Sequence, residues 1–122
     1  MTAATAQATG FPTLSFADVR AQLLEQREIA LFDVREEDPF AQAHPLWAAN
    51  LPLSRIEIDA WRRIPRRDTL IVLYGEHAGA DLAPLAAGRL SALGYSRVHL
   101  LEGGLEGWRA AGGELFRDVN VP

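Results

Sequence analysis

The side chains best suited to chemistry in this 122-residue sequence gather in one short segment, residues 75–81. The segment consists of Gly75, Glu76, His77, Ala78, Gly79, Ala80 and Asp81. Carboxylate and imidazole groups this close together can exchange protons with a substrate or ligate a metal ion. The segment contains no serine or threonine, however, and the whole chain contains no cysteine. This excludes a thiolate nucleophile, a disulfide and a cysteine-zinc site, and it leaves no hydroxyl nucleophile in the segment.

His77 is the candidate general base of this segment, and Glu76, His77 and Asp81 are the candidate metal ligands. A lone histidine in a loop is usually solvated, and a base without a nucleophile or a metal contributes little. The three candidate ligands come from one short loop without a supporting shell. We therefore expect no catalytic role for His77, no metal site and no cofactor.

A strand and a helix position this segment. Residues 70–74 form a short, unbroken apolar run that ends in Tyr74, which is typical of a strand buried on both faces. Residues 82–93 carry alanine and leucine at helical spacing, and Asp81 can cap the first turn of that helix. A loop from the carboxyl end of a parallel strand into a helix is where open α/β sheets build their sites.

Two charged residues follow a second apolar run, residues 29–34. Asp33 and Arg35 lie at the carboxyl end of this predicted strand, and we expect them at the same sheet edge as the segment 75–81. Arg35 could line a residual ligand pocket. The favoured interpretation is an ion pair or hydrogen-bond support that holds the loops.

Strand and helix signals alternate along the chain, which predicts a single α/β domain: a parallel sheet of about five strands with helices on both faces. We expect a disordered lead-in at residues 1–11, the domain at 12–117 and a tail or linker at 118–122. Ser15 is predicted to cap a helix with core-facing Phe16, Val19, Leu23 and Leu24. Further strands are predicted at 12–15, 49–51 and 97–101, a last helix at 105–111, and a final edge strand at Leu115 and Phe116.

The stretch between residues 46 and 61 has two tryptophans in irregular surroundings. Ser54 is expected to cap a short helix that contains Ile58 and Trp61. Trp47 and Trp61, with Leu46 and Ile58, could form either part of the core or a docking patch, and core packing is the favoured interpretation.

The composition indicates a protein without nucleic-acid or membrane partners. The formal net charge is −4, whereas a nucleic-acid surface needs a basic face. The first ten residues lack the basic and apolar regions of a signal peptide, and no apolar stretch is long enough to span a membrane. We expect a cytoplasmic location.

Two motifs at a defined separation resemble those of a known family. Asp33, Val34, Arg35 and Glu36 form the first motif. The second runs from Glu102-Gly103-Gly104 through Trp108 to Gly112, and Trp108 is expected to pack the last helix on the sheet. In this order and spacing the chain resembles a rhodanese-like (sulfurtransferase) domain over residues 13–116.

The resemblance implies transfer of sulfane sulfur through a cysteine persulfide, with the cysteine directly after the central strand. Backbone N–H groups and a helix N-terminus stabilise such a thiolate. Here Gly75 stands at that position, and no arginine or lysine occurs between Arg67 and Arg89. Glu76 and Asp81 place negative charge where an anionic sulfur would lie. The segment looks like the loops in non-catalytic halves of tandem sulfurtransferases.

The sequence therefore predicts a catalytically silent rhodanese-like domain, a structural or regulatory module of a longer tandem sulfurtransferase whose cysteine lies elsewhere. Its expected partners are adjacent rhodanese domains in the same polypeptide. One alternative is a stand-alone protein that binds a small ligand or a protein through residues 75–81. An enzyme with new chemistry in the old pocket is the weakest alternative, because both the nucleophile and the cation are missing. Whether the domain is an enzyme thus stays open.

Overall fold

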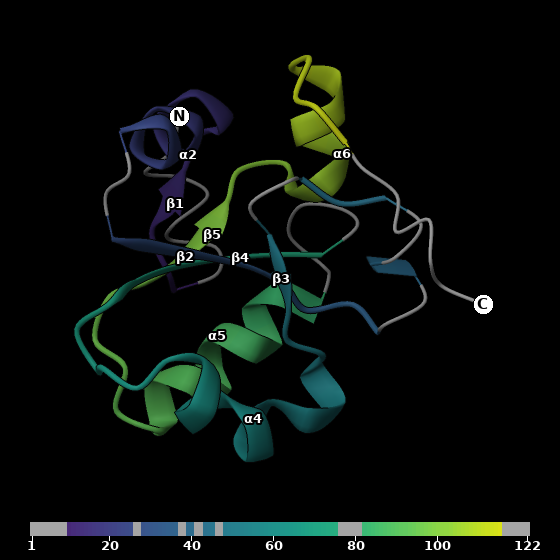
Figure 1. Cartoon of the computed structure of the whole chain (residues 1–122). Coiled ribbons are helices and arrows are strands. Elements are labelled where there is room, and N and C mark those ends of the chain that lie inside the picture. The colour runs from purple at the N-terminus through teal and green to yellow at the C-terminus, as the bar shows by residue number, and fades with distance from the viewer. Residues whose placement is uncertain are drawn as a thin grey trace.

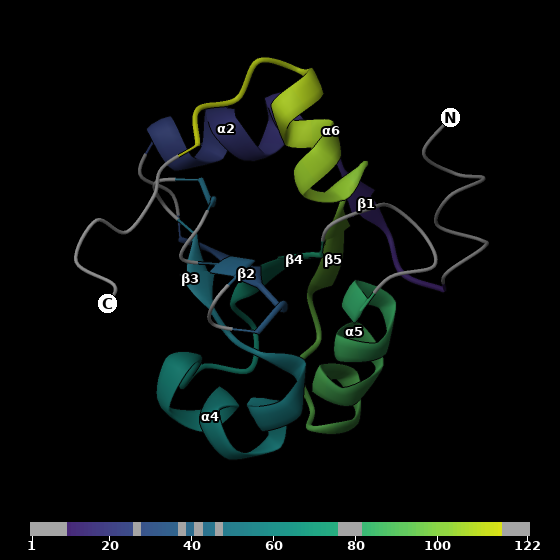
Figure 2. The same ribbon diagram turned by 90° about the vertical axis from the view of Figure 1, so that its right-hand side faces the viewer.

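The architecture is a five-stranded parallel sheet between two layers of helices (Figures 1 and 2). The computed structural model describes residues 10–25, 28–36, 39–40, 43–45, 48–75 and 82–115. The strands are β1 (Thr13–Leu14), β2 (Ile29–Asp33), β3 (Ala49–Asn50), β4 (Leu70–Tyr74) and β5 (Val98–Leu101). The helices are α2 (Phe16–Leu24), α4 (Ile56–Arg63), α5 (Leu82–Ala92) and α6 (Gly104–Ala110), with a 3-10 turn, η1, at Leu53–Arg55.

The strand order is β1-β5-β4-β2-β3, and every pairing is parallel. The apolar strand β4 lies at the centre, and all five of its residues are buried. The predicted α/β class, the parallel sheet and its number of strands are therefore confirmed. Because all strands run the same way, the carboxyl ends of β2 and β4 meet at one edge of the sheet.

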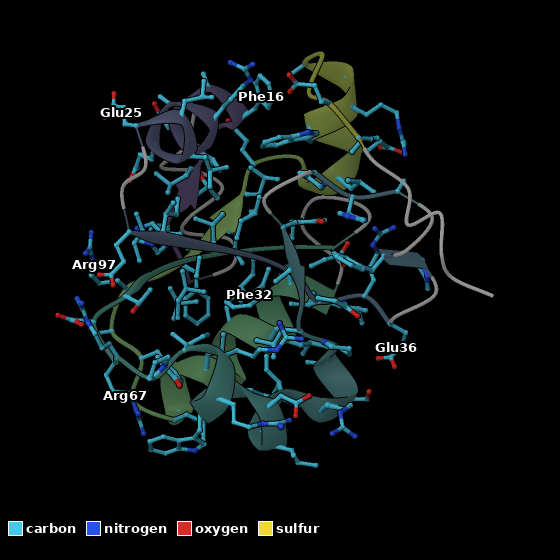
Figure 3. The ribbon with its side chains drawn as sticks, viewed as in Figure 1. Phe16, Glu25, Phe32, Glu36, Arg67 and Arg97 are labelled. Atoms are coloured by element: carbon cyan, nitrogen blue, oxygen red, sulfur yellow. The ribbon has the colours of Figure 1, made fainter. Side chains whose placement is uncertain are left out.

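One face of the sheet packs against α4 and α5, and the other against α2 and α6 (Figure 2). Figure 3 shows Phe32 directed toward the α4 and α5 layer and Phe16 in the opposite layer. The alanine and leucine stripe of α5 is buried in the first layer, as its spacing predicts. In the second layer Trp108 is 1% exposed and lies edge-on to Phe16, with ring centroids 4.7 Å apart. Trp108 thus packs the last helix on the sheet, as expected.

Several local predictions need correction. Ser15 does cap α2 as predicted, since its side chain accepts a hydrogen bond from the Asp18 amide at 3.1 Å. Leu24, however, which is predicted to face the core, is 52% exposed. Ser54 does not cap α4, because it lies inside the 3-10 turn and its hydroxyl donates to the Glu36 carboxylate. Leu115 forms no strand, and Phe116 lies outside the described residues.

The preference for core packing at residues 58 and 61 is wrong. Ile56 and Ala60, four residues apart, form the buried side of α4, which turns Ile58 and Trp61 outward. Leu46 and Trp47 lie outside the described residues.

No helix in the described ranges is long and apolar enough to cross a membrane.

Candidate functional site

The predicted site begins where β4 ends. Gly75 is buried, and its carbonyl accepts a hydrogen bond from the Leu105 amide in the first turn of α6 at 3.0 Å. Residue 75 is thereby attached to the helix that follows β5. The other predicted site residues, Glu76, His77, Ala78, Gly79, Ala80 and Asp81, lie outside the described residues, so the expectations about them stay predictions.

Beside Gly75, the end of β2 carries a buried ion pair. Asp33 is fully buried and Arg35 is 7% exposed. The Arg35 Nη2 lies 2.6 Å from Asp33 Oδ2, and Nε lies 3.0 Å from each carboxylate oxygen. The Arg35 backbone amide also donates to Asp33 Oδ1 at 2.8 Å. The two residues thus bind each other through both their side chains and the Arg35 backbone amide, at the turn that leaves β2.

The same turn is tied to two neighbouring segments. Arg35 Nη2 donates to the Ala43 carbonyl at 2.7 Å. The Asn50 side-chain amide, at the end of β3, donates to the carbonyls of Asp33 and Arg35 at 3.0 and 2.8 Å. Our sequence analysis did not identify Asn50. A polar side chain at the end of a short strand was the available signal, but its partners depend on the pairing of β3 with β2.

Tyr74 is the second residue that the sequence analysis missed. It is the register partner of Asp33 in the pairing of β4 with β2, so the two side chains lie on the same face of the sheet. Tyr74 is fully buried, and its hydroxyl makes no hydrogen bond within the described part of the chain. Burial, and then the negative charge of Asp33, raise the pKa of the Tyr74 phenol far above its ordinary value. Tyr74 is therefore a neutral phenol at any physiological pH.

These groups have little capacity for chemistry. The charges of Asp33 and Arg35 neutralise each other, and the Tyr74 phenol stays protonated. Within the described ranges, no group of three histidine, aspartate or glutamate residues could hold a metal ion. The side chains of Asp33, Arg35 and Asn50 instead form hydrogen bonds with main-chain groups at the edge of the sheet where β2 and β3 end.

Comparisons with known proteins point to one family. A model of the rhodanese-like domain matches residues 16–111. The crystal structure of a thiosulfate sulfurtransferase from Pseudomonas aeruginosa is 67% identical, with a TM-score of 0.83. A protein from Bacillus halodurans is 27% identical, with a TM-score of 0.78, and covers 88% of this chain and 77% of its own.

The lengths of the relatives differ from that of this chain. The Pseudomonas match covers 90% of this chain but 21% of the Pseudomonas one. An uncharacterized protein of Synechocystis sp. is 30% identical over 101 residues, which are 83% of this chain and 54% of that protein. The chain thus spans about half of one relative and about a fifth of the other.

Proposed function

This chain belongs to the rhodanese-like domain family, and from that membership we propose that it is a catalytically silent domain. It acts as a structural or regulatory module of a longer, tandem sulfurtransferase, and the nucleophilic cysteine lies on another domain of that polypeptide.

One observation carries the proposal: the chain has no cysteine. Sulfur transfer through a persulfide needs a thiolate, which no other side chain replaces. Gly75 occupies the position that directly follows the central strand, where the family has its cysteine. The coverage of the Pseudomonas and Synechocystis relatives supports the tandem context, because in both proteins the matching region is part of a longer chain.

The contacts at the end of β2 support a structural role for the charged residues of the first motif. Asp33 and Arg35 bind each other and the backbone around them. We assign them to holding the loops at this edge, because a cation already bound to a buried carboxylate is poorly available to a ligand. The silent domain would then keep the shape of a rhodanese edge without its reactive group.

The first test is a thiosulfate:cyanide sulfurtransferase assay of this chain. We expect thiocyanate formation equal to that of a buffer blank. A Gly75→Cys variant should gain at most weak activity, since Glu76 and Asp81 oppose a thiolate and no arginine or lysine occurs between residues 67 and 89. Alkylation of the new thiol as a function of pH should give a pKa at or above about 8.5, the ordinary value of a cysteine.

Three results would each contradict one part of the proposal: the catalytic silence, the charge argument and the tandem context. Turnover that survives purification and disappears on substitution of His77 would make the domain an enzyme in its own right. Strong activity of Gly75→Cys would show that the anion cradle is intact. A native polypeptide no longer than 122 residues, measured by immunoblot in the source cells, would instead favour the stand-alone binding module.

A further inference from the structure

The layer formed by α4 and α5 has three large apolar side chains that face solvent instead of the core. Ile58 is 65% exposed, Trp61 53% and Leu85 59%. Ile58 and Trp61 lie three residues apart on α4 and so share a side of that helix. The Glu57 carboxylate on α4 lies 3.7 Å from the Arg89 guanidinium on α5, one turn beyond Leu85. Ile58 and Trp61 on α4, together with Leu85 on the neighbouring helix α5, are what we call the α4–α5 patch.

Trp61 is held in place although half of it faces solvent. The Arg67 guanidinium carbon lies 3.4 Å from the centroid of the Trp61 ring and 5.0 Å from that of Tyr95. Arg67 Nε also donates to the Leu93 carbonyl at 3.0 Å. Figure 3 shows Arg67 at the margin of the α4 and α5 layer. A fixed tryptophan loses little conformational entropy on binding, and tryptophan and arginine dominate the energetics of interfaces.

We propose that the α4–α5 patch is the surface through which this domain packs against a neighbouring domain of the same polypeptide. This inference rests on the proposed function, because it requires the longer chain. Its occupant has an apolar centre that covers Trp61 and acidic groups around it.

The size of the patch favours a tethered partner. The patch offers three large apolar side chains as the centre of a contact, whereas a stable complex of free proteins involves about 20–30 residues a side in all. Covalent linkage supplies an effective concentration of about millimolar, at which a small and partly polar contact persists. In the Pseudomonas and Synechocystis relatives the matching region is indeed part of a longer chain.

The charge around the patch disfavours a second copy packed through the same face. Residues 55–68 contain five arginines against three carboxylates, in a chain whose net charge is −4. Asp59 already binds Arg55 and Arg62, which lowers the pKa of its carboxyl. Two such faces brought together would place positive charge against positive charge, whereas an acidic neighbour would pair with it.

Hydroxyl-radical footprinting tests the proposal in the native polypeptide. Side-chain oxidation of Trp61 and Ile58 should be about fivefold or more slower there than in the separate 122-residue domain, since the centre of an interface excludes water. Leu24 is the matched control, because it is 52% exposed on α2, in the opposite helix layer. Its oxidation should be the same in both samples.

An Ile58→Ser variant gives a second measurement. Ile58 faces solvent in the isolated domain, so the variant should fold normally. In the native polypeptide it should speed limited proteolysis between domains about tenfold, the change that a lost interface contact of about 1.4 kcal/mol produces. A Leu24→Ser variant should leave the proteolysis rate unchanged.

The outcomes separate this inference from the proposed function. A native polypeptide of only 122 residues would overturn both. A longer polypeptide in which Trp61 is oxidised as fast as in the separate domain would overturn the inference alone. Protection of Trp61 in the separate domain that grows with its concentration would assign the patch to a second copy, and it too would overturn the inference.

Discussion

At the scale of single residues, the ion pair of Asp33 and Arg35 is the clearest link between sequence and structure at this site. Both residues could be placed from the sequence, because the apolar run before them predicts a strand and their charges predict a pair. That Asn50 and Tyr74 both lie beside Asp33 could not be predicted, since it depends on the register between neighbouring strands. Register depends on long-range packing, which a local pattern does not contain. Of residues 75–81, the structure describes Gly75 alone.

An Asp33→Asn substitution should be strongly destabilising. It leaves the buried Arg35 guanidinium without its counter-charge, which is expected to lower the free energy of unfolding by about 3 to 5 kcal/mol. Urea unfolding followed by circular dichroism measures the change.

Asp68→Asn is the matched control. Asp68 pairs with Arg66 at 3.3 Å, but the two side chains are 70% and 60% exposed. An exposed pair of this kind contributes at most about 1 kcal/mol. Equal losses for the two variants would show that Asp33 and Arg35 are solvated and do not hold the edge of the sheet.

At the scale of elements, the strands and most helices follow from the sequence because apolar periodicity determines which face is buried. The predictions that failed concern apolar residues that are exposed and a serine that does not cap its helix. In α4, Ile56 and Ala60 are the apolar residues on the buried side of the helix. The side chains of Ile58 and Trp61 therefore face solvent. At Ser54 a tight 3-10 turn precedes the helix and removes the need for a side-chain cap. Both depend on how α4 docks on the sheet.

Two helical glycines should respond in opposite ways to alanine. A Cβ on Gly107, in α6, would lie 2.9 Å from the Glu102 carbonyl oxygen, which belongs to the backbone and cannot move freely. Gly107→Ala is expected to lower the free energy of unfolding by about 1 to 3 kcal/mol. Gly88, in α5, has nothing within 4 Å of such a Cβ. Gly88→Ala should therefore raise the free energy of unfolding by up to about 1 kcal/mol, because alanine has a higher helix propensity than glycine.

Thermal or chemical unfolding of the two variants measures this contrast. A stabilising Gly107→Ala would mean that the close approach of α6 to the turn after β5 relaxes at little cost.

At the scale of the whole molecule, the class, the parallel sheet and the number of strands could all be predicted, since short unbroken apolar runs joined through helices leave few other arrangements.

The fold also makes both tyrosines of the chain reporters of global unfolding. Burial raises the pKa of Tyr74 and of Tyr95. A group whose pKa is raised on folding stabilises the folded state below its unfolded pKa, here about 10, and this contribution is lost as the pH rises further.

We therefore expect no phenolate absorbance near pH 10 while the domain is folded. The signal should appear together with the loss of circular dichroism as the pH is raised, and the domain should become less stable above pH 10. The Tyr74→Phe variant, which leaves Tyr95 as the one tyrosine, should lose less stability over that range. Titration of both phenols at their ordinary pKa in a folded sample would contradict the buried positions.

Both outermost strands, β1 and β3, are only two residues long. Edge strands expose unpaired backbone groups that can recruit strands from other chains, and very short edges limit this recruitment. The hazard is greatest where similar domains are synthesised one after another, because a strand can then be exchanged between them during folding. With so little edge to extend, the sheet of this domain offers few backbone groups for strand exchange or amyloid-like growth.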